Sequence, residues 1–211
     1  MWQVEWQPMY IPRHFEQLDK DTLRDLIRDF PLATVVVNTD NGLSANHIPM
    51  IIRQDQSNGL RLQGHIARAN PLCQAELSAE ALAIFQGPNA YISPNWYATK
   101  KLHGKVVPTW NYTTVHATGQ LNIIDDRDWT LAMISTLTDK QEASQTAPWA
   151  VTDAPVDFTA GLLSAIVGIE LTVTSLSGKW KVSQNQPEEN RDGVRAGLKA
   201  QSSLDSDRLI E

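Results

Sequence analysis

The chain has 211 residues and carries 24 Asp and Glu against 18 Lys and Arg, so its formal net charge is −6. This balance argues against a broad non-specific DNA-binding surface, because phosphate contacts need clustered basic charge. A single cysteine excludes an intrachain disulfide framework, and no Cys/His cluster has zinc spacing, so we expect no metal site. Without a signal-peptide pattern or a membrane-length apolar run, the sequence predicts a cytoplasmic protein that does not enter membranes.

The N-terminal stretch, residues 1–18, has two prolines and no hydrophobic period, which predicts an extended arm. A helix is predicted over 19–30, where apolar residues recur at helical spacing until Pro31 stops them. The large rings of the arm need burial on this chain or on a partner. These rings are Trp2, Trp6, Tyr10 and Phe15.

About six strands are predicted from β-branched and alternating stretches. Asn-Gly pairs at 41–42 and 58–59 predict turns that join the first three strands into an antiparallel meander. Pro49 places part of the second strand at an edge or a bulge. Ser177 and Gly178 predict a turn before the last strand. The predicted strands cover 32–38, 43–53, 60–66, 81–86 with a continuation at 90–93, 109–124, 165–174 and 180–183.

Helical segments are predicted between and after these strands, at 71–77, within 94–108, from Asp125 or Asp126 onward, at 158–163 and at 187–200, with an irregular stretch at 141–155 and a frayed end from 201. Such local connections favour a mainly β (α+β) fold, a small six-stranded antiparallel barrel with peripheral helices. We expect a single domain over 1–211, with an arm at 1–18 and a C-terminal helix and tail at 186–211.

The stretch 86–119 is distinctive because no acidic residue occurs between Glu80 and Asp125. It gathers aromatic and basic side chains, namely Tyr91, Trp96, Tyr97, Trp110, Tyr112, Lys100, Lys101, Lys105 and His103. Aromatic faces stack on flat rings, whereas Lys and Arg bind phosphate. An acidic protein with one such island is expected to bind a planar anionic ligand there. The alternative is that the rings fill a core and the lysines are solvated.

Familiar catalytic motifs are missing: there is no Gly-x-Ser-x-Gly, no GxGxxG and no Walker loop, which argues against a hydrolase or a P-loop enzyme. His65 and Arg68 come just before a predicted helix start, where free N–H groups favour a phosphate. For His14, His103 and His116 a backbone partner is the expected role. Lys179, Lys181 and Arg191 are expected to be solvated unless their loop folds over the site.

Several long motifs, in this order, make the sequence resemble the PaiB family, whose members are described as FMN-binding negative transcriptional regulators. They are Met9-Tyr10-Ile11-Pro12, Ala45 to Pro49 (ANHIP), Gly64 to Pro71 (GHIARANP), Gly87 to Pro94 (GPNAYISP), Val107 to Tyr112 (VPTWNY) and Lys179 to Asn190. The resemblance implies an FMN-binding split β-barrel, similar to the pyridoxamine-phosphate oxidase and flavin reductase group. It also implies a homodimer with two flavins at the subunit interface.

The resemblance further implies where the flavin is held. The ribityl phosphate would be lined by His65, Ala67 and Arg68, and the isoalloxazine edge would be bordered by Asn46, His47 and Ile48. The pocket would be closed, in part from the other subunit, by Trp96, Tyr97, Trp110 and Tyr112. The implied cofactor-binding residues are Asn46, His47, Ile48, His65, Ile66, Ala67, Arg68, Asn70, Trp96, Tyr97, Lys100, Trp110, Asn111, Tyr112, Lys181, Gln184, Asn185 and Arg191.

Three functions remain open at this stage. The first is a dimeric FMN-binding negative regulator of transcription, for which direct DNA binding is doubtful because no basic recognition helix is evident. The second is an FMN-dependent oxidoreductase of a small substrate, in which no residue stands out as a catalytic acid or base. The third is a heme-binding protein with His47, His65 or His116 as iron ligand.

Overall fold

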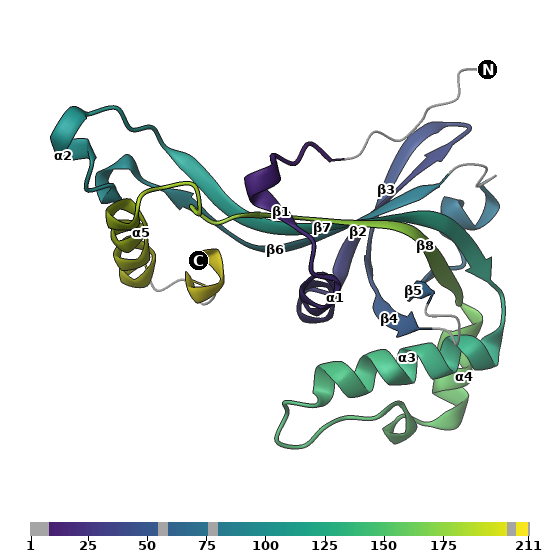
Figure 1. Ribbon diagram of the computed structural model, residues 1–211. Coiled ribbons are helices and arrows are strands. Elements are labelled where there is room, and N and C mark those ends of the chain that lie inside the picture. Colours follow the sequence, from purple (N-terminus) through teal and green to yellow (C-terminus); the bar gives the residue numbers. More distant parts are fainter. Residues whose placement is uncertain (1–8, 55–58, 76–79, 202–205, 211) are drawn as a thin grey trace. The chain divides into compact units, whose positions relative to one another are not determined.

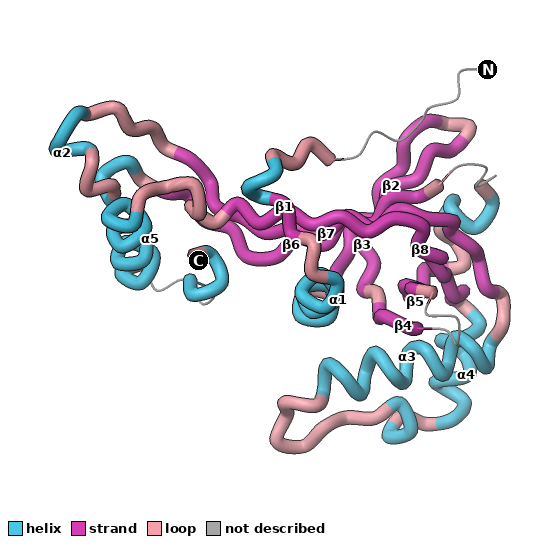
Figure 2. The backbone as a smooth tube through the Cα atoms, viewed as in Figure 1, coloured by secondary structure: helices cyan, strands magenta, loops and turns pink. Residues whose placement is uncertain are grey.

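The computed structural model describes residues 9–54, 59–75, 80–201 and 206–210. Within them, strands are joined by turns and by helices, as drawn in Figure 1 and Figure 2. The chain divides into two compact units. Unit 1 comprises Met1–Asp29, Gln86–His116 and Ser177–Glu211, and unit 2 comprises Phe30–Phe85 and Ala117–Leu176. The long strands β6 (Ala81–Ile92), β7 (Thr109–Ile124) and β8 (Ile166–Lys181) each contribute residues to both units.

The sheet order is β3-β2-β6-β7-β8-β5-β4, and β1 pairs with β8. The remaining strands are β1 (Glu16–Gln17), β2 (Leu32–Thr39), β3 (Gly42–Pro49), β4 (Ile51–Gln54) and β5 (Leu60–Ala67). The pairs β1/β8, β2/β3, β2/β6, β4/β5 and β5/β8 are antiparallel, so the mainly β prediction with peripheral helices is confirmed. The described residues form eight strands rather than the six predicted.

The two hairpins of the predicted meander are confirmed, but the predicted strand 43–53 is broken at Met50, so the three strands form no continuous meander. β2 pairs with β3 and β4 pairs with β5, but β3 and β4 lie at opposite ends of the sheet order. The change of direction occurs at Met50, whose N–H donates to the carbonyl of Pro31 (2.8 Å). At Gly64 on β5 an added Cβ would lie 2.8 Å from the carbonyl oxygen of Pro49. The two ends of the order therefore approach each other within unit 2, as in a barrel.

The predicted turn at Ser177 and Gly178 is also wrong, because β8 runs through it and Gly178 pairs with Gln17 of β1. A Cβ at Gly178 would lie 2.1 Å from Leu23 Cδ2 on α1 (Lys20–Asp29). Gly87 likewise lies inside β6 rather than interrupting it, and its Cβ would meet Thr113 Oγ1 at 2.2 Å. These glycines permit close packing instead of chain reversal.

In unit 2, the sheet is covered by α3 (Arg127–Glu142) and α4 (Val156–Ser164), which lie side by side (Figure 1). The predicted cap is confirmed, since Asp126 Oδ1 accepts from the N–H of Trp129 (2.9 Å). The ring of Trp129 lies where a Cβ of Gly168 on β8 would be. The predicted helix at 71–77 is a single 3₁₀ turn, η2 (Pro71–Gln74), and its last two residues lie outside the described part.

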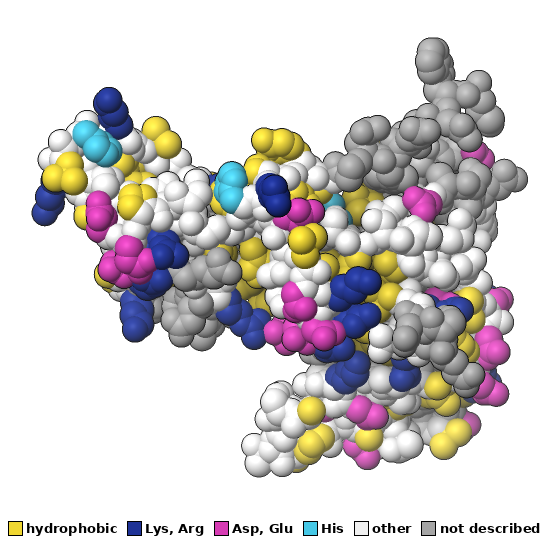
Figure 3. Space-filling model, viewed as in Figure 1, with side chains coloured by type: hydrophobic (Ala, Val, Ile, Leu, Met, Phe, Trp, Pro, Cys, Tyr) yellow, Lys and Arg dark blue, Asp and Glu magenta, His cyan; other side chains and the backbone are white. Residues whose placement is uncertain are grey.

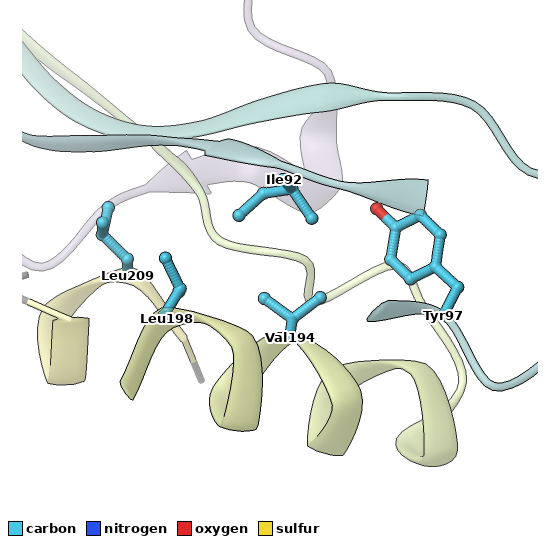
Figure 4. Close-up of a cluster of buried hydrophobic side chains, with 5 residues drawn as sticks. All are labelled: Ile92, Tyr97, Val194, Leu198 and Leu209. Carbon is cyan, nitrogen blue, oxygen red and sulfur yellow. The ribbon is translucent and has the colours of Figure 1, made fainter. Parts of the chain in front are cut away.

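In unit 1, the short α2 (Lys100–His103) and the long α5 (Glu188–Ala200) follow the predictions for these segments. Figure 4 shows Val194 and Leu198 of α5 directed toward Ile92 of β6, with Leu209 beside them. Leu209 is fully buried in η5 (Ser206–Leu209), so the prediction of a frayed end is wrong for this segment. In Figure 3, Lys and Arg lie next to Asp and Glu over α5, where Glu188 pairs with Arg191 and Arg195.

The arm predicted over residues 1–18 is ordered where it is described. It contains η1 (Arg13–Phe15) and β1, and Phe15 is buried, whereas Tyr10 is 81% exposed. Trp2 and Trp6 lie outside the described residues. In the described part of the chain, no helix is long and apolar enough to cross a membrane.

Candidate functional site

The predicted cofactor-binding residues fall into two groups, one in each unit. The unit 2 group lies on β3, β5 and the turn after β5: Asn46, His47, Ile48, His65, Ile66, Ala67, Arg68 and Asn70. The unit 1 group lies on η3 (Pro94–Trp96), α2, β7, the end of β8 and α5: Trp96, Tyr97, Lys100, Trp110, Asn111, Tyr112, Lys181, Gln184, Asn185 and Arg191.

An amide pair connects the two strands of the unit 2 group. Asn70 Nδ2 donates to Asn46 Oδ1 at 2.9 Å, and Asn70 Oδ1 accepts from the N–H of Leu72, which caps η2. Ile48 and Ile66 are buried, so their side chains belong to the core and only their backbone is left to contact a ligand. The amide pair thus sets the position of the turn after β5 relative to β3.

His65 is the residue of this group that most clearly lacks a partner. Its Nδ1 is buried and makes no hydrogen bond within the described part of the chain. Burial lowers the pKa of His65 below its ordinary value, so the ring is neutral near pH 7. A buried polar atom without a partner is costly, so a ligand group that bonds to it would be favoured. His47 differs, because it is exposed and its Nδ1 is hydrogen-bonded to Thr34 Oγ1 at 3.1 Å.

Arg68, expected to bind phosphate, is engaged by the protein itself. Its Nη2 and Nη1 donate to the two carboxylate oxygens of Asp125 at 2.7 and 2.9 Å. Its Nε and Nη2 also donate to the carbonyls of Ser164 and Ile166. The helix-start argument also weakens, since η2 is one 3₁₀ turn whose N–H at Leu72 is already capped. Arg68 therefore joins the end of β5 to the segments next to β7 and β8.

In unit 1, strand alternation separates residues that are adjacent in sequence. Trp110 and Tyr112 line a hollow of about 320 Å³ on one face of β7, together with Gln86, Asn89 and Thr114. Asn111 lines a different cavity. Trp110 is 54% exposed and meets Tyr91 edge to face with ring centroids 6.1 Å apart. The aromatic hollow offers flat faces and amides, which suit a planar ring with polar edges.

The second cavity has a volume of about 410 Å³ and is polar and cationic. Four predicted residues reach it, namely Tyr97, Asn111, Lys181 and Asn185. Lys181 donates to the hydroxyl of Thr109 and to the carbonyl of Trp110. The prediction missed the other lining residues, which are Thr99, His103, Lys105, Val106, Val107, Thr109, Ser183, Gln186, Pro187 and Asn190. The polar pair Asn185-Gln186, which follows Lys181 closely in the sequence, was the feature that could have indicated this cavity.

The other predicted residues of unit 1 have structural partners. Lys100 donates to the side chain of Asn95, and Arg191 pairs with Glu188. Trp96 packs against α5, and Gln184 closes a turn by bonding to the backbone of Trp180 and Val182. Lys179 was expected to be solvated; instead it is buried, donates to the carbonyl of Tyr10 and lies over the rings of Tyr10 and Tyr112.

For metal binding, the described residues show no group of three or more His, Cys, Asp or Glu side chains placed to hold an ion.

Comparison with known proteins agrees with this architecture. A family model described as "Putative FMN-binding domain" matches residues 9–175. The chain is 34% identical to an uncharacterized protein of Emericella nidulans, over 90% of each chain. It is 26% identical to the protease synthase and sporulation protein PAI 2 of Bacillus subtilis, over 96% of this chain and 95% of that protein. The solved structure of the FAD and heme binding protein from Mycobacterium smegmatis is similar with a TM-score of 0.58 at 18% identity, covering 86% of this chain and 80% of that one.

These matches confirm the resemblance to PaiB, the split-barrel fold and, at the level of the family, a flavin cofactor of the FMN type. The matched region includes all of β2 to β7 and both the amide pair and the aromatic hollow described above. The chain belongs to the family of proteins that carry the putative FMN-binding domain.

Proposed function

We propose that this protein is a homodimeric flavoprotein that binds FMN without a covalent bond and acts as a negative regulator of transcription. The observation that supports a bound flavin is the family match over residues 9–175, which includes strands β2 to β7. The fold alone leaves function open, so the residues themselves must suit the cofactor.

The side chains fit FMN in each unit. In unit 2, the buried Nδ1 of His65 lacks a partner among the described residues, and the amides of Asn46 and Asn70 border the same segment. In unit 1, Trp110 and Tyr112 present ring faces in the aromatic hollow. We assign hydrogen bonding with FMN to the unit 2 set, and the ring faces of the aromatic hollow in unit 1 are a separate surface that suits a planar ring. Arg68 is assigned a structural role because its guanidinium is paired with Asp125.

Bound FMN would supply hydride or single-electron chemistry, and the protein would bind, orient and shield it. His65, neutral near pH 7, can donate or accept a hydrogen bond but carries no charge to the flavin. Trp110, which is half exposed, would lose water contact when a ring stacks on it. These roles require no acid or base from the protein.

The regulatory part of the proposal rests on the resemblance to PaiB, and the Bacillus subtilis relative is named protease synthase and sporulation protein PAI 2. The net charge of −6 disfavours tight non-specific DNA binding. We therefore propose that regulation responds to the state of the flavin rather than to base readout by this chain.

The homodimer is supported by large apolar side chains that are exposed on unit 1. Leu102 is 77% exposed and Val107 72% exposed, and Tyr91 and Trp110 are about half exposed. Such residues on neighbouring segments are typical of a surface that a partner covers.

The decisive experiment is an absorption spectrum and an FMN titration of the purified protein, with sedimentation to determine its mass. A yellow dimer that binds one FMN per chain is expected, and a colourless monomer that ignores FMN would contradict the proposal. Reduction by NAD(P)H with turnover of an acceptor would instead favour an oxidoreductase, and a Soret band would favour a heme-binding protein. A promoter-fragment mobility shift tests direct DNA contact.

A further inference from the structure

The 410 Å³ cavity of unit 1 has the composition of an anion site. It lies among α2, β7, the end of β8 and the start of α5, and its wall includes the cationic Lys105 and Lys181 as well as His103. None of the described residues that line it is Asp or Glu. The first-turn acid Glu188 of α5 is already paired with Arg191 and Arg195.

Lys181 is half-buried in this wall with uncompensated charge. Two of its three N–H donors bond to Thr109 Oγ1 and to the Trp110 carbonyl, which leaves one donor for a ligand. In the described part of the chain, neither Lys181 nor the nearby Lys179 forms an ion pair with a carboxylate. Burial and the charge of Lys179 lower the pKa of Lys181, as expected for a cation that lacks an anion.

Polar groups around Lys181 are fixed by hydrogen bonds. Asn111 Nδ2 donates to Ser183 Oγ at 2.9 Å and to the carbonyl of Leu209 at 3.0 Å. In the same wall, the buried Asn190 accepts from the N–H and the hydroxyl of Thr99. Ser183 has a φ of 67°, in the left-handed region that a residue with a side chain rarely adopts. The cavity is therefore prearranged rather than a loose surface depression.

The cavity is distinct from the aromatic hollow of unit 1. Strand alternation places Asn111 in this cavity and Trp110 and Tyr112 in the hollow. Moreover, the FMN-binding match ends at residue 175, whereas the wall residues Lys181 and Asn190 follow it. The wall thus combines residues inside the matched region, such as Thr109 and Asn111, with residues that follow it.

We propose that this cavity is a second ligand site, which binds a small organic anion with a carboxylate or a phosphate monoester group through Lys181. The inference goes beyond flavin binding: it gives the protein a place for an effector. A charge-assisted hydrogen bond from a partly buried ammonium would supply much of the affinity.

The test uses the 211-residue protein saturated with FMN. Inorganic phosphate and succinate are titrated separately by calorimetry at constant ionic strength, with chloride as the reference ion. Binding of one of them with 1:1 stoichiometry is expected, and the responding probe tells the phosphate source from the carboxylate source. Lys181→Met should weaken that binding about tenfold or more. Lys101→Met, an exposed lysine of α2 outside the cavity wall, is the matched control and should change nothing.

Three results would overturn the inference: neither probe binds, Lys181→Met binds the probe as well as wild type, or Lys181→Met loses FMN together with the probe. The last result would assign the cavity to the flavin. If Lys181→Met fails to fold, Lys105→Met replaces an exposed cation of the same wall and should also weaken the probe. A protein that binds phosphate or succinate but not FMN would refute the proposed flavin function and leave this site standing.

Discussion

Arg68 and Asp125 form a bidentate ion pair across unit 2, although they are far apart in sequence. The guanidinium donates to both carboxylate oxygens, at 2.7 and 2.9 Å, and joins the end of β5 to the residue that follows β7. The pairing raises the pKa of Arg68 and lowers the pKa of Asp125. The sequence predicts that Arg68 binds a phosphate, but in the structure its guanidinium is paired with Asp125 instead.

The first prediction concerns this pair. Arg68→Ala and Asp125→Ala should each lower the melting temperature, and the double variant should lose little more than either single one, because the two side chains act together. FMN affinity should change equally in both single variants. If Arg68→Ala abolishes FMN binding while Asp125→Ala preserves it, Arg68 is a phosphate ligand after all.

The second prediction concerns the pH dependence of stability. Burial lowers the pKa of His65 in the folded protein, so the unfolded chain binds the proton more readily. The free energy of unfolding is therefore not reduced by His65 above the ordinary pKa of 6.5, and it declines as the pH falls below that value. Denaturation midpoints measured from about pH 8 to 5 should fall, and less steeply in His65→Gln. His116, whose pKa burial also lowers, accounts for part of the remaining slope.

The third prediction concerns the docking of α5. A Cβ at Gly193 would lie 1.8 Å from the carbonyl oxygen of Trp96, which is backbone and cannot move aside easily. Gly193→Ala should lower the free energy of unfolding by about 1–3 kcal/mol despite the higher helix propensity of alanine. The control is Gly161→Ala in α4, where nothing lies within 4 Å of the added Cβ. That variant should be stabilised by about 0.4–1 kcal/mol in urea titrations.

The fourth prediction concerns the aromatic hollow. If Trp110 stacks on the flavin, Trp110→Ala should weaken FMN binding by about 0.5–1.5 kcal/mol beyond the loss of buried area, and Trp110→Phe should restore most of it. Quenching of flavin fluorescence measures the affinity. Phe158→Ala in α4, another exposed ring, serves as the control. Equal FMN affinity of Trp110→Ala and wild type would remove the hollow from the flavin site.

The fifth prediction concerns the C-terminal segment. Leu209 is fully buried against the core of unit 1, and its carbonyl accepts from Asn111. Leu209→Ala should lower the free energy of unfolding by about 2–5 kcal/mol, as for other buried leucines. Leu43→Ala, at a position 75% exposed on β3 of unit 2, should change it by less than about 0.5 kcal/mol. Similar denaturation curves for both variants would show that the segment is dispensable.

Local features of the fold were predictable because nearby residues determine them. Asp126 caps α3, and Gly42 takes a φ of 99° in the predicted hairpin turn. Alternating apolar residues marked β5 and β7, and the ordered motifs identified the family. In contrast, the turn predicted at Gly178 failed since the glycine there makes room for Leu23, which lies 155 positions earlier in the chain.

By itself, the sequence determined the mainly β class, most helix positions and the flavin-binding family, because periodicity, caps and motifs act within a few residues. Only the tertiary structure decided the strand order, the partner of Arg68 and the separation of Asn111 from Trp110 and Tyr112. Those features depend on which distant segments pack together: side chains alternate between the faces of a strand, and an ion pair forms wherever folding brings opposite charges into contact.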